Sequence, residues 1–267
     1  MAAGAFESIF LHIVGGIIVS ILTMFVIYLC YRIPAYNVQR LVGFRFRLDT
    51  EVRITYEHLL LNEASLGAYP YVKPSRKDNA PPSQYKSIEH PVSEGEIRAS
   101  AYLVSLFGFR GFLRPALRPL LMSDERCETI LDGNFVALGG SNYKTEDILA
   151  SEENIFLSLS PAGFTVSGQR PMLDANLGFI LRIRPRKFPR RSWLVCAGVG
   201  EWGTSGSAWY LANRWNHLIR IIHPLAYWSG FSIPDFLAVI RVEPGRDESA
   251  DIEAIYRNVS GRAEKVA

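Results

Sequence analysis

The chain has 267 residues, of which 48% are hydrophobic, 12% aromatic and 21% charged, a balance that excludes an intrinsically disordered protein. The length allows a core large enough to fold without disulfides or a structural metal. The three cysteines, Cys30, Cys127 and Cys196, include no CxxC pair and have no histidine at ligand spacing. This excludes zinc ribbons, redox motifs and disulfide scaffolds, and we expect no metal site. The net charge of +3 is too small to identify a partner by itself.

The first long apolar stretch, from Ile9 to Tyr31, predicts a membrane-spanning helix. Its 23 residues contain no Asp, Glu, Lys or Arg. As a helix they would be about 35 Å long, enough to cross a hydrocarbon core of about 30 Å. A cleaved signal peptide is the alternative, but it needs a basic segment in front and a cleavage site of small residues behind. Here Glu7 precedes the stretch and Arg32 is the first basic residue, which favours an anchor.

Basic residues after this stretch predict its orientation, and they are Arg32, Arg40, Arg45 and Arg47. The positive-inside rule places the short amino terminus outside and the bulk of the chain in the cytoplasm, as in a single-pass protein of the inner (plasma) membrane. We expect a tail and transmembrane helix at 1–32, a juxtamembrane and amino-terminal part of the cytoplasmic domain at 33–129, and an α/β part at 130–267. Residues 44–125 form a separate domain or complete the same sheet, and the lack of a long linker after Pro91 favours the latter.

The cytoplasmic part begins with a period-two pattern at 44–56, which predicts a strand or a hairpin. Five prolines among polar residues make 67–92 a loop. Ser93 and Glu96 form a capping box ahead of apolar residues at helical spacing, so a helix begins there. The basic and apolar stretch at 110–120 could lie against an anionic membrane, but its two prolines interrupt a helix and favour a folded surface connection.

From Asn134 onward, apolar runs alternate with helical patterns. Strands are expected at 135–138, 164–166, 178–183, 193–197 and 236–242, and helices at 145–149 and 204–222. The second and third of these strands are predicted to pair antiparallel, because little helical pattern separates them. The runs are continuously apolar, which indicates strands buried on both faces. The predicted fold class is α/β: an N-terminal single transmembrane helix followed by a Rossmann-like, mainly parallel sheet with helices on both faces.

The most informative motif is the glycine loop Gly198-Val-Gly200-Glu-Trp-Gly203, which follows a predicted strand and precedes the long helix. This G-x-G-x-x-G form lets the backbone approach a phosphate at the amino terminus of a helix. A complete NAD-binding domain does not fit, because its acidic residue stands about 20 positions after the motif. Here Glu243, at the end of the next strand, lies 40 positions after Gly203. The alternative interpretation is a tight turn that packs the helix on the sheet.

A second loop, Gly139-Gly140-Ser141-Asn142, follows the strand expected at 135–138. Both loops project from the same edge of a parallel sheet, and they converge if their strands are neighbours. Asn142 could bond a sugar or a base, or it could cap the following helix. Together the loops could line a pocket for a phosphorylated or nucleotide-like ligand, and the candidate ligand-binding residues are Gly139, Gly140, Ser141, Asn142, Thr145, Gly198, Gly200, Glu201, Gly203, Thr204 and Ser205.

The succession of FVALGGSN, a helix, an aliphatic strand, AGVGEWGTSG and another helix resembles a known pattern. It is similar to the Rossmann-like, two-loop domains attached to membrane helices in prokaryotic signalling and defence proteins, over about residues 130–245. The resemblance implies a nucleotide-type ligand for the two loops. It transfers no catalytic residue and names no cofactor.

A run of six basic residues within ten positions predicts a basic surface, and its members are Arg182, Arg184, Arg186, Lys187, Arg190 and Arg191. Two prolines within the run make it a loop after a strand. Its charges could simply be solvated, or they could bind anionic lipid headgroups or a protein partner. Nucleic acid is not expected as a partner, because the run has few aromatic residues and no recognition motif.

The sequence assigns no catalytic residue. Glu201 and Asp147 could supply paired carboxylates for glycosidic chemistry, but carboxylates just inside a helix usually complement its dipole. No GxSxG, HExxH, Walker A or Cys/His dyad is present. The first hypothesis is a membrane-anchored sensor or effector whose cytoplasmic domain binds a nucleotide or phosphorylated small molecule. The alternatives are a hydrolase or transferase on the same scaffold, and a membrane-tethered interaction module without a small ligand.

Overall fold

The computed structural model describes most of the α/β part of the chain and several shorter stretches before it. Described are residues 14–27, 38, 41–42, 51–57, 92–108, 118–127, 129–130, 132–160, 163–167, 169, 171–224 and 233–267. The backbone alone is described for three short strands, which form a sheet of their own: β2 (Leu60–Asn62), β3 (Tyr71–Val72) and β4 (Tyr85–Lys86).

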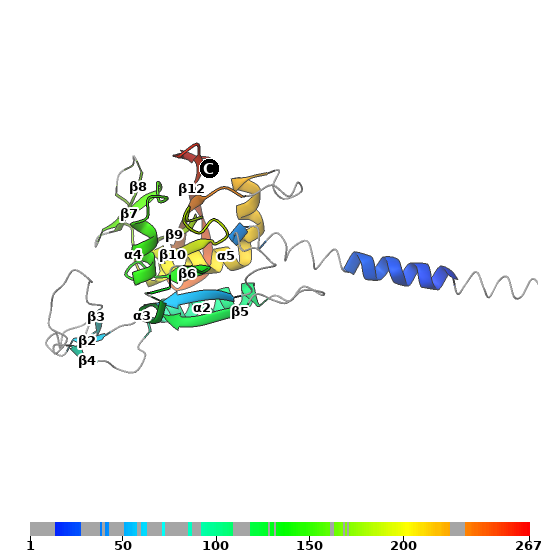
Figure 1. Ribbon diagram of the computed structural model, residues 1–267, viewed down its shortest axis with the longest axis horizontal. Helices are drawn as coiled ribbons and strands as arrows, with labels where there is room; N and C mark the ends of the chain where they lie inside the picture. Colours follow the sequence, from blue (N-terminus) through cyan, green and yellow to red (C-terminus); the bar gives the residue numbers. More distant parts are fainter. Residues whose placement is uncertain are drawn as a thin grey trace, which may run out of the picture.

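The amino-terminal helix covers residues 14–27, and it corrects the prediction of a transmembrane helix. Within the described ranges, no helix is both long and apolar enough to cross a membrane. The large apolar side chains of the amino-terminal helix are exposed, and Figure 1 shows it in blue, away from the α/β body. The predicted transmembrane helix is therefore wrong for the described residues, whereas the predicted location at the inner (plasma) membrane stays a prediction. The rest of the stretch from Ile9 to Tyr31 lies outside the described residues.

An eight-stranded sheet forms the centre of the α/β body (Figure 1). In spatial order its strands are β13 (Arg262–Lys265), β12 (Arg246–Val259), β11 (Phe236–Glu243), β9 (Leu177–Ile183), β10 (Trp193–Gly198), β6 (Phe135–Leu138), β1 (Glu51–Tyr56) and β5 (Arg118–Ser123). The strands β1 and β5 thus lie in the same sheet as the strands of the carboxyl-terminal half.

Two kinds of pairing meet in this sheet. The strands β10, β6, β1 and β5 are parallel neighbours, whereas the four pairings from β13 to β10 are antiparallel. The predicted Rossmann-like, mainly parallel sheet is therefore wrong, because the sheet is mixed and mostly antiparallel. Tight turns account for part of the difference. The strand β11 returns as β12 through Gly245 at φ 84°, and β12 returns as β13 through Ser260 and Gly261, both at positive φ.

Several predicted elements are confirmed. The helix α2 (Glu94–Phe107) begins after Ser93, whose Oγ accepts a hydrogen bond of 3.2 Å from the amide of Glu96. The strands β6, β9, β10 and β11 lie where the apolar runs predicted them. The strand β8 (Gly163–Val166) is also present, but the predicted pairing with β9 is wrong, because β8 pairs with β7 (Leu157–Ser160). The two segments do meet, since the rings of Phe164 and Phe179 pack edge to face with centroids 5.1 Å apart.

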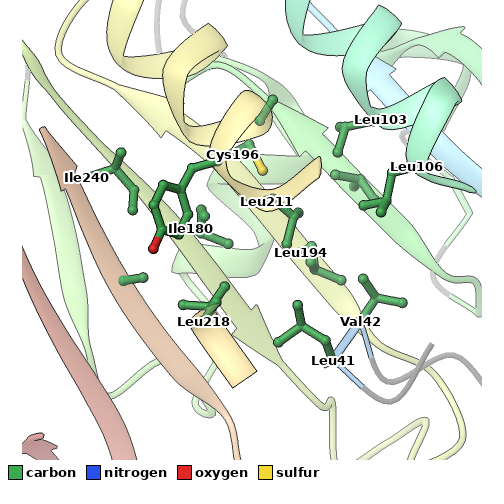
Figure 2. Close-up of a cluster of buried hydrophobic side chains, with 14 of the residues drawn as sticks. Leu41, Val42, Leu103, Leu106, Ile180, Leu194, Cys196, Leu211, Leu218 and Ile240 are labelled. Atoms are coloured by element: carbon green, nitrogen blue, oxygen red, sulfur yellow. The ribbon is translucent and has the colours of Figure 1, made fainter. Parts of the chain in front are cut away.

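Helices and a hairpin cover the two faces of the sheet. The helices α2 and α5 (Glu201–Ile222) lie on one face, and α4 (Tyr143–Leu149) and the β7–β8 hairpin lie on the other. Figure 2 shows the first of these cores, where leucines of α2 and α5 pack over apolar side chains of the strands. Its labelled members include Leu103, Leu106, Leu211, Leu218, Ile180, Leu194, Cys196 and Ile240.

Three glycines let α5 lie directly on the sheet. A Cβ added to Gly203 would overlap the carbonyl oxygen of Leu177 and lie 2.9 Å from Cα of Gly198. A Cβ added to Gly198 would lie 2.7 Å from the carbonyl carbon of Gly203, and one added to Gly178 would overlap the carbonyl oxygen of Gly203. No larger residue fits without moving the helix, so the backbone of α5 contacts the backbones of β9 and β10.

We expect Gly203→Ala to lower the free energy of unfolding by about 1–3 kcal/mol, because the added methyl group forces the helix and the sheet apart. Urea denaturation followed by circular dichroism measures this change. Gly140→Ala is the matched control, since its nearest neighbour would be Cδ1 of Leu159 at 3.6 Å. Equal stabilities of the wild type and Gly203→Ala would contradict the close packing.

Candidate functional site

The four parallel strands end together at one edge of the sheet, which we call the carboxyl edge. Along the chain, β1 comes first and is followed by β5, β6 and β10, but in the sheet the order is β5, β1, β6, β10. The chain therefore places β5 on one side of β1, and then crosses back to place β6 and β10 on the other side. Such a reversal is a topological switch point, and ligands of open α/β sheets bind outside the carboxyl ends of the strands at this point. Here the switch point lies between β1 and β6.

Two short segments meet at the switch point. Glu57 follows the last residue of β1, and Gly139 follows the last residue of β6. The two strands are in register, with Thr55 opposite Ala137. The hydroxyl of Ser141 donates a hydrogen bond of 2.9 Å to Oε2 of Glu57, so the loop after β6 is tied to the end of β1.

A second carboxylate reaches the same place from the first turn of α2. Glu96 is 3% exposed, and its Oε2 accepts a hydrogen bond of 3.0 Å from the amide of Glu57. Gly139 has φ 81°, and a Cβ at this position would overlap Oε1 of Glu96 and lie 3.7 Å from Oε2 of Glu57. Two carboxylates therefore meet over Gly139, one of them buried and the other half-buried.

Neither of these carboxylates is among the ligand-binding residues predicted from the sequence. The capping box marks Glu96, but as a helix start and not as part of a site. Glu57 carries no local signal, because a charged residue after a strand is common. The pairing of β1 with β6 brings Glu57 to Gly139, and the contact of α2 with the end of β1 brings Glu96 to Glu57; the sequence reveals neither.

The two predicted loops are neighbours, as expected for adjacent parallel strands. The strands β6 and β10 pair with Leu138 opposite Cys196, and a Cβ on Gly140 would lie 4.0 Å from the carbonyl oxygen of Gly198. The glycine loop itself has mainly a packing role, since Gly198 and Gly203 hold α5 against the sheet. This is the alternative interpretation that the sequence left open.

The start of α5 differs from the starts of α2 and α4. Gly200 is the N-cap of α5 and offers no side chain to the amides of the first turn, whereas Ser93 and Asn142 cap the other two helices with their side chains. The first amides of a helix have no partner within it and carry partial positive charge. Glu201 is exposed beside them. The predicted ligand residues Thr204 and Ser205, which follow in the same turn, are both buried.

Asn142 and Thr145 hold the second loop in place. Asn142 is fully buried, and its Oδ1 accepts a hydrogen bond of 2.9 Å from the amide of Lys144 while its Nδ2 donates one of 2.9 Å to the carbonyl oxygen of Thr55. The hydroxyl of Thr145 donates a hydrogen bond of 2.8 Å to the carbonyl oxygen of Gly139. Asn142 is thus a helix cap, and it links α4 to the end of β1.

The predicted basic surface is only partly a surface. Arg182 is 1% exposed, so its assignment to a surface is wrong; its Nη1 donates a hydrogen bond of 2.8 Å to the carbonyl oxygen of Ile233. Burial, and to a lesser degree the neighbouring charge of Arg184, lowers the pKa of Arg182 to about 9. Arg184 donates to the same carbonyl oxygen over 2.7 Å, and Arg191 pairs with an aspartate over 2.6 Å. The exposed members of the run are Arg186, Lys187 and Arg190.

Other groups offer less to a reaction. Asp147 pairs with Lys144 over 3.5 Å, and Glu201 lies on a different helix. Among the residues that the structure describes, no group of three or more His, Cys, Asp and Glu side chains is placed to hold a metal ion. Burial raises the pKa of Cys127 to about 11 and that of Cys196 to about 12. Neither thiol is a ready nucleophile near neutral pH, because the thiolate is the reactive form.

No protein-family model matches the chain, and a comparison with curated proteins finds no match either. The resemblance to two-loop domains of signalling and defence proteins therefore stays a prediction.

Cys127 and Cys196 are expected to resist iodoacetamide in the folded protein at pH 8. A thiol with a pKa of about 11 is ionised in only about one molecule in a thousand at this pH. Both should react quickly in urea, where burial is lost and the pKa returns to its ordinary value. Peptide mapping by mass spectrometry measures the two sites separately, and rapid labelling of either in the folded state at pH 8 would contradict their burial.

Proposed function

We propose that the α/β body binds a nucleotide-type ligand at the carboxyl edge, between the end of β1 and the start of α5, as a sensor or effector. The observation that carries this proposal is the pairing of Glu57 with Ser141 at the switch point, beside a helix start without a side-chain cap. The ligand's sugar lies against the carboxylate, and its phosphate lies against the amides of α5.

The sugar end of the site is supported by the chemistry of Glu57. Its carboxylate is half-buried and accepts hydrogen bonds, so it suits a ligand that offers hydroxyl donors. In dinucleotide-binding α/β domains a carboxylate likewise accepts hydrogen bonds from the ribose hydroxyls. Ser141 can exchange its bond to Glu57 for one to the ligand.

The phosphate end is supported by the geometry of α5. The helix has 22 residues and begins at the carboxyl edge, so its amides and its dipole face the place where the strands end. Gly200 leaves space at this point, since among the described residues a Cβ there would meet only the carbonyl oxygen of Ala175 at 3.5 Å. Within the glycine loop, Gly200 therefore makes room for the ligand, whereas Gly198 and Gly203 pack α5 on the sheet.

A hydrolase or transferase acting on a glycosidic bond is the second candidate, and the meeting of Glu96 with Glu57 over Gly139 favours it. Two carboxylates in unlike surroundings can divide the roles of proton donor and base or nucleophile. Release of free base from ADP by the wild type, abolished in Glu96→Gln, would identify this candidate. ADP binding with no product would leave the binding role alone.

Glu57→Gln tests the binding role. We expect ADP to bind about 10-fold or more weakly to this variant, because hydrogen bonds to a charged acceptor contribute about 1.5–3 kcal/mol. Isothermal titration calorimetry with the full chain measures the affinity. Glu264→Gln, an exposed change on β13, is the matched control for the lost charge. Unchanged ADP affinity in Glu57→Gln, or no binding of ADP by the wild type, would contradict the proposal.

A further inference from the structure

Arg98 of α2 lies at the start of α5, although the sequence did not single it out. Its guanidinium carbon is 4.1 Å from the centroid of the Trp202 ring, and Trp202 stands in the first turn of α5. The first turns of the two helices are in direct contact, since a Cβ on Gly95 would lie 2.7 Å from the carbonyl oxygen of Glu201. Arg98 is therefore the basic side chain that packs on the proposed phosphate end of the site.

Buried acceptors fix the orientation of this guanidinium. Its Nε donates to Oδ2 of Asp247 over 3.1 Å, and its Nη2 donates to the hydroxyl of Ser205 over 3.3 Å. Asp247 is 4% exposed, and it also accepts hydrogen bonds from Ser205 over 2.5 Å and from Tyr102 over 3.1 Å. Ser205, predicted to touch a ligand, instead belongs to this buried network.

The third nitrogen of the guanidinium has a different partner. Nη1 of Arg98 pairs with the carboxylate of Glu94, one turn earlier on α2, and the side chain of Glu94 is 76% exposed. An exposed pair of this kind contributes about 0.2–1 kcal/mol, so an anion in solution can replace the carboxylate at little cost. The network at Asp247 keeps the guanidinium on Trp202 when Glu94 leaves.

We propose that Arg98 binds the phosphate of the ligand, and that the carboxylate of Glu94 occupies the position of that phosphate in the free protein. The inference extends the proposed function, because it identifies the group that selects phosphorylated ligands over their nucleosides. A fixed guanidinium beside the first turn of α5 is a strong site for a phosphate, which accepts several hydrogen bonds at once. Glu94 thus competes with the phosphate for Arg98.

Glu94→Gln in the full chain tests this inference without disturbing the buried network. We expect ADP to bind about 2- to 5-fold more tightly than to the wild type, since the competing ion pair is lost. The affinity for adenosine should not change. Glu243→Gln is the matched control, because Glu243 is 67% exposed and pairs with Arg246 instead of Arg98. It also follows Val242, which lies against Gly206 of α5. An equal gain in both variants, or no gain in Glu94→Gln, overturns the inference.

Two further measurements separate this inference from the proposed function. Arg98→Lys keeps the positive charge but not the planar contacts of the guanidinium. We expect the double variant Glu94→Gln, Arg98→Lys to lose the gain in ADP affinity that Glu94→Gln causes alone. Equal affinities for ADP and adenosine in every variant would overturn the role of Arg98 and leave the sugar site intact.

Inorganic pyrophosphate is the probe for the phosphate alone. Binding of pyrophosphate to Glu94→Gln supports the role of Arg98 even if adenosine binding is not detectable. If no probe binds any variant, both proposals are overturned.

Discussion

The contact between the backbone of α5 and the backbones of β9 and β10 determines the arrangement of the carboxyl edge. Gly178, Gly198 and Gly203 lack the side chains that would hold the helix away, so its first turn lies directly beside the ends of the parallel strands. The start of α2 then packs on Glu201 through Gly95. This one close approach positions the amides of α5, the network at Asp247 and the start of α2 relative to one another.

The carboxyl edge is divided by charge. At the switch point, Glu57 and Glu96 supply acceptors that suit the hydroxyl groups of a sugar. At the start of α5, helix amides and Arg98 suit a phosphate, and Glu94 lies against this positive group. A ligand with hydroxyls at one end and phosphate at the other matches both regions, and neither inorganic phosphate nor a neutral sugar matches the two together.

Local patterns in the sequence predict elements well and their pairing poorly. Continuous apolar runs predicted β6, β9 and β10, and the capping box at Ser93 predicted the start of α2. The strand β12 escaped prediction because its outer residues are polar, and β5 because Pro119 interrupts it. The mixed sheet and the meeting of Glu57 with Glu96 depend on pairings between distant segments, and no local spacing encodes them. Arg182 is buried because backbone carbonyls near β11 accept its hydrogen bonds, which a run of basic residues does not reveal.

Hydrogen exchange of the full chain, measured by mass spectrometry with and without ADP, tests the central claim most directly. The account predicts that ADP slows exchange at the carboxyl edge, in peptides containing Glu57, the first turn of α2, Gly139 to Ser141 and the first turn of α5. Peptides from β13 should be unchanged. Protection confined to segments away from the carboxyl edge, or no protection at a saturating ADP concentration, would contradict it.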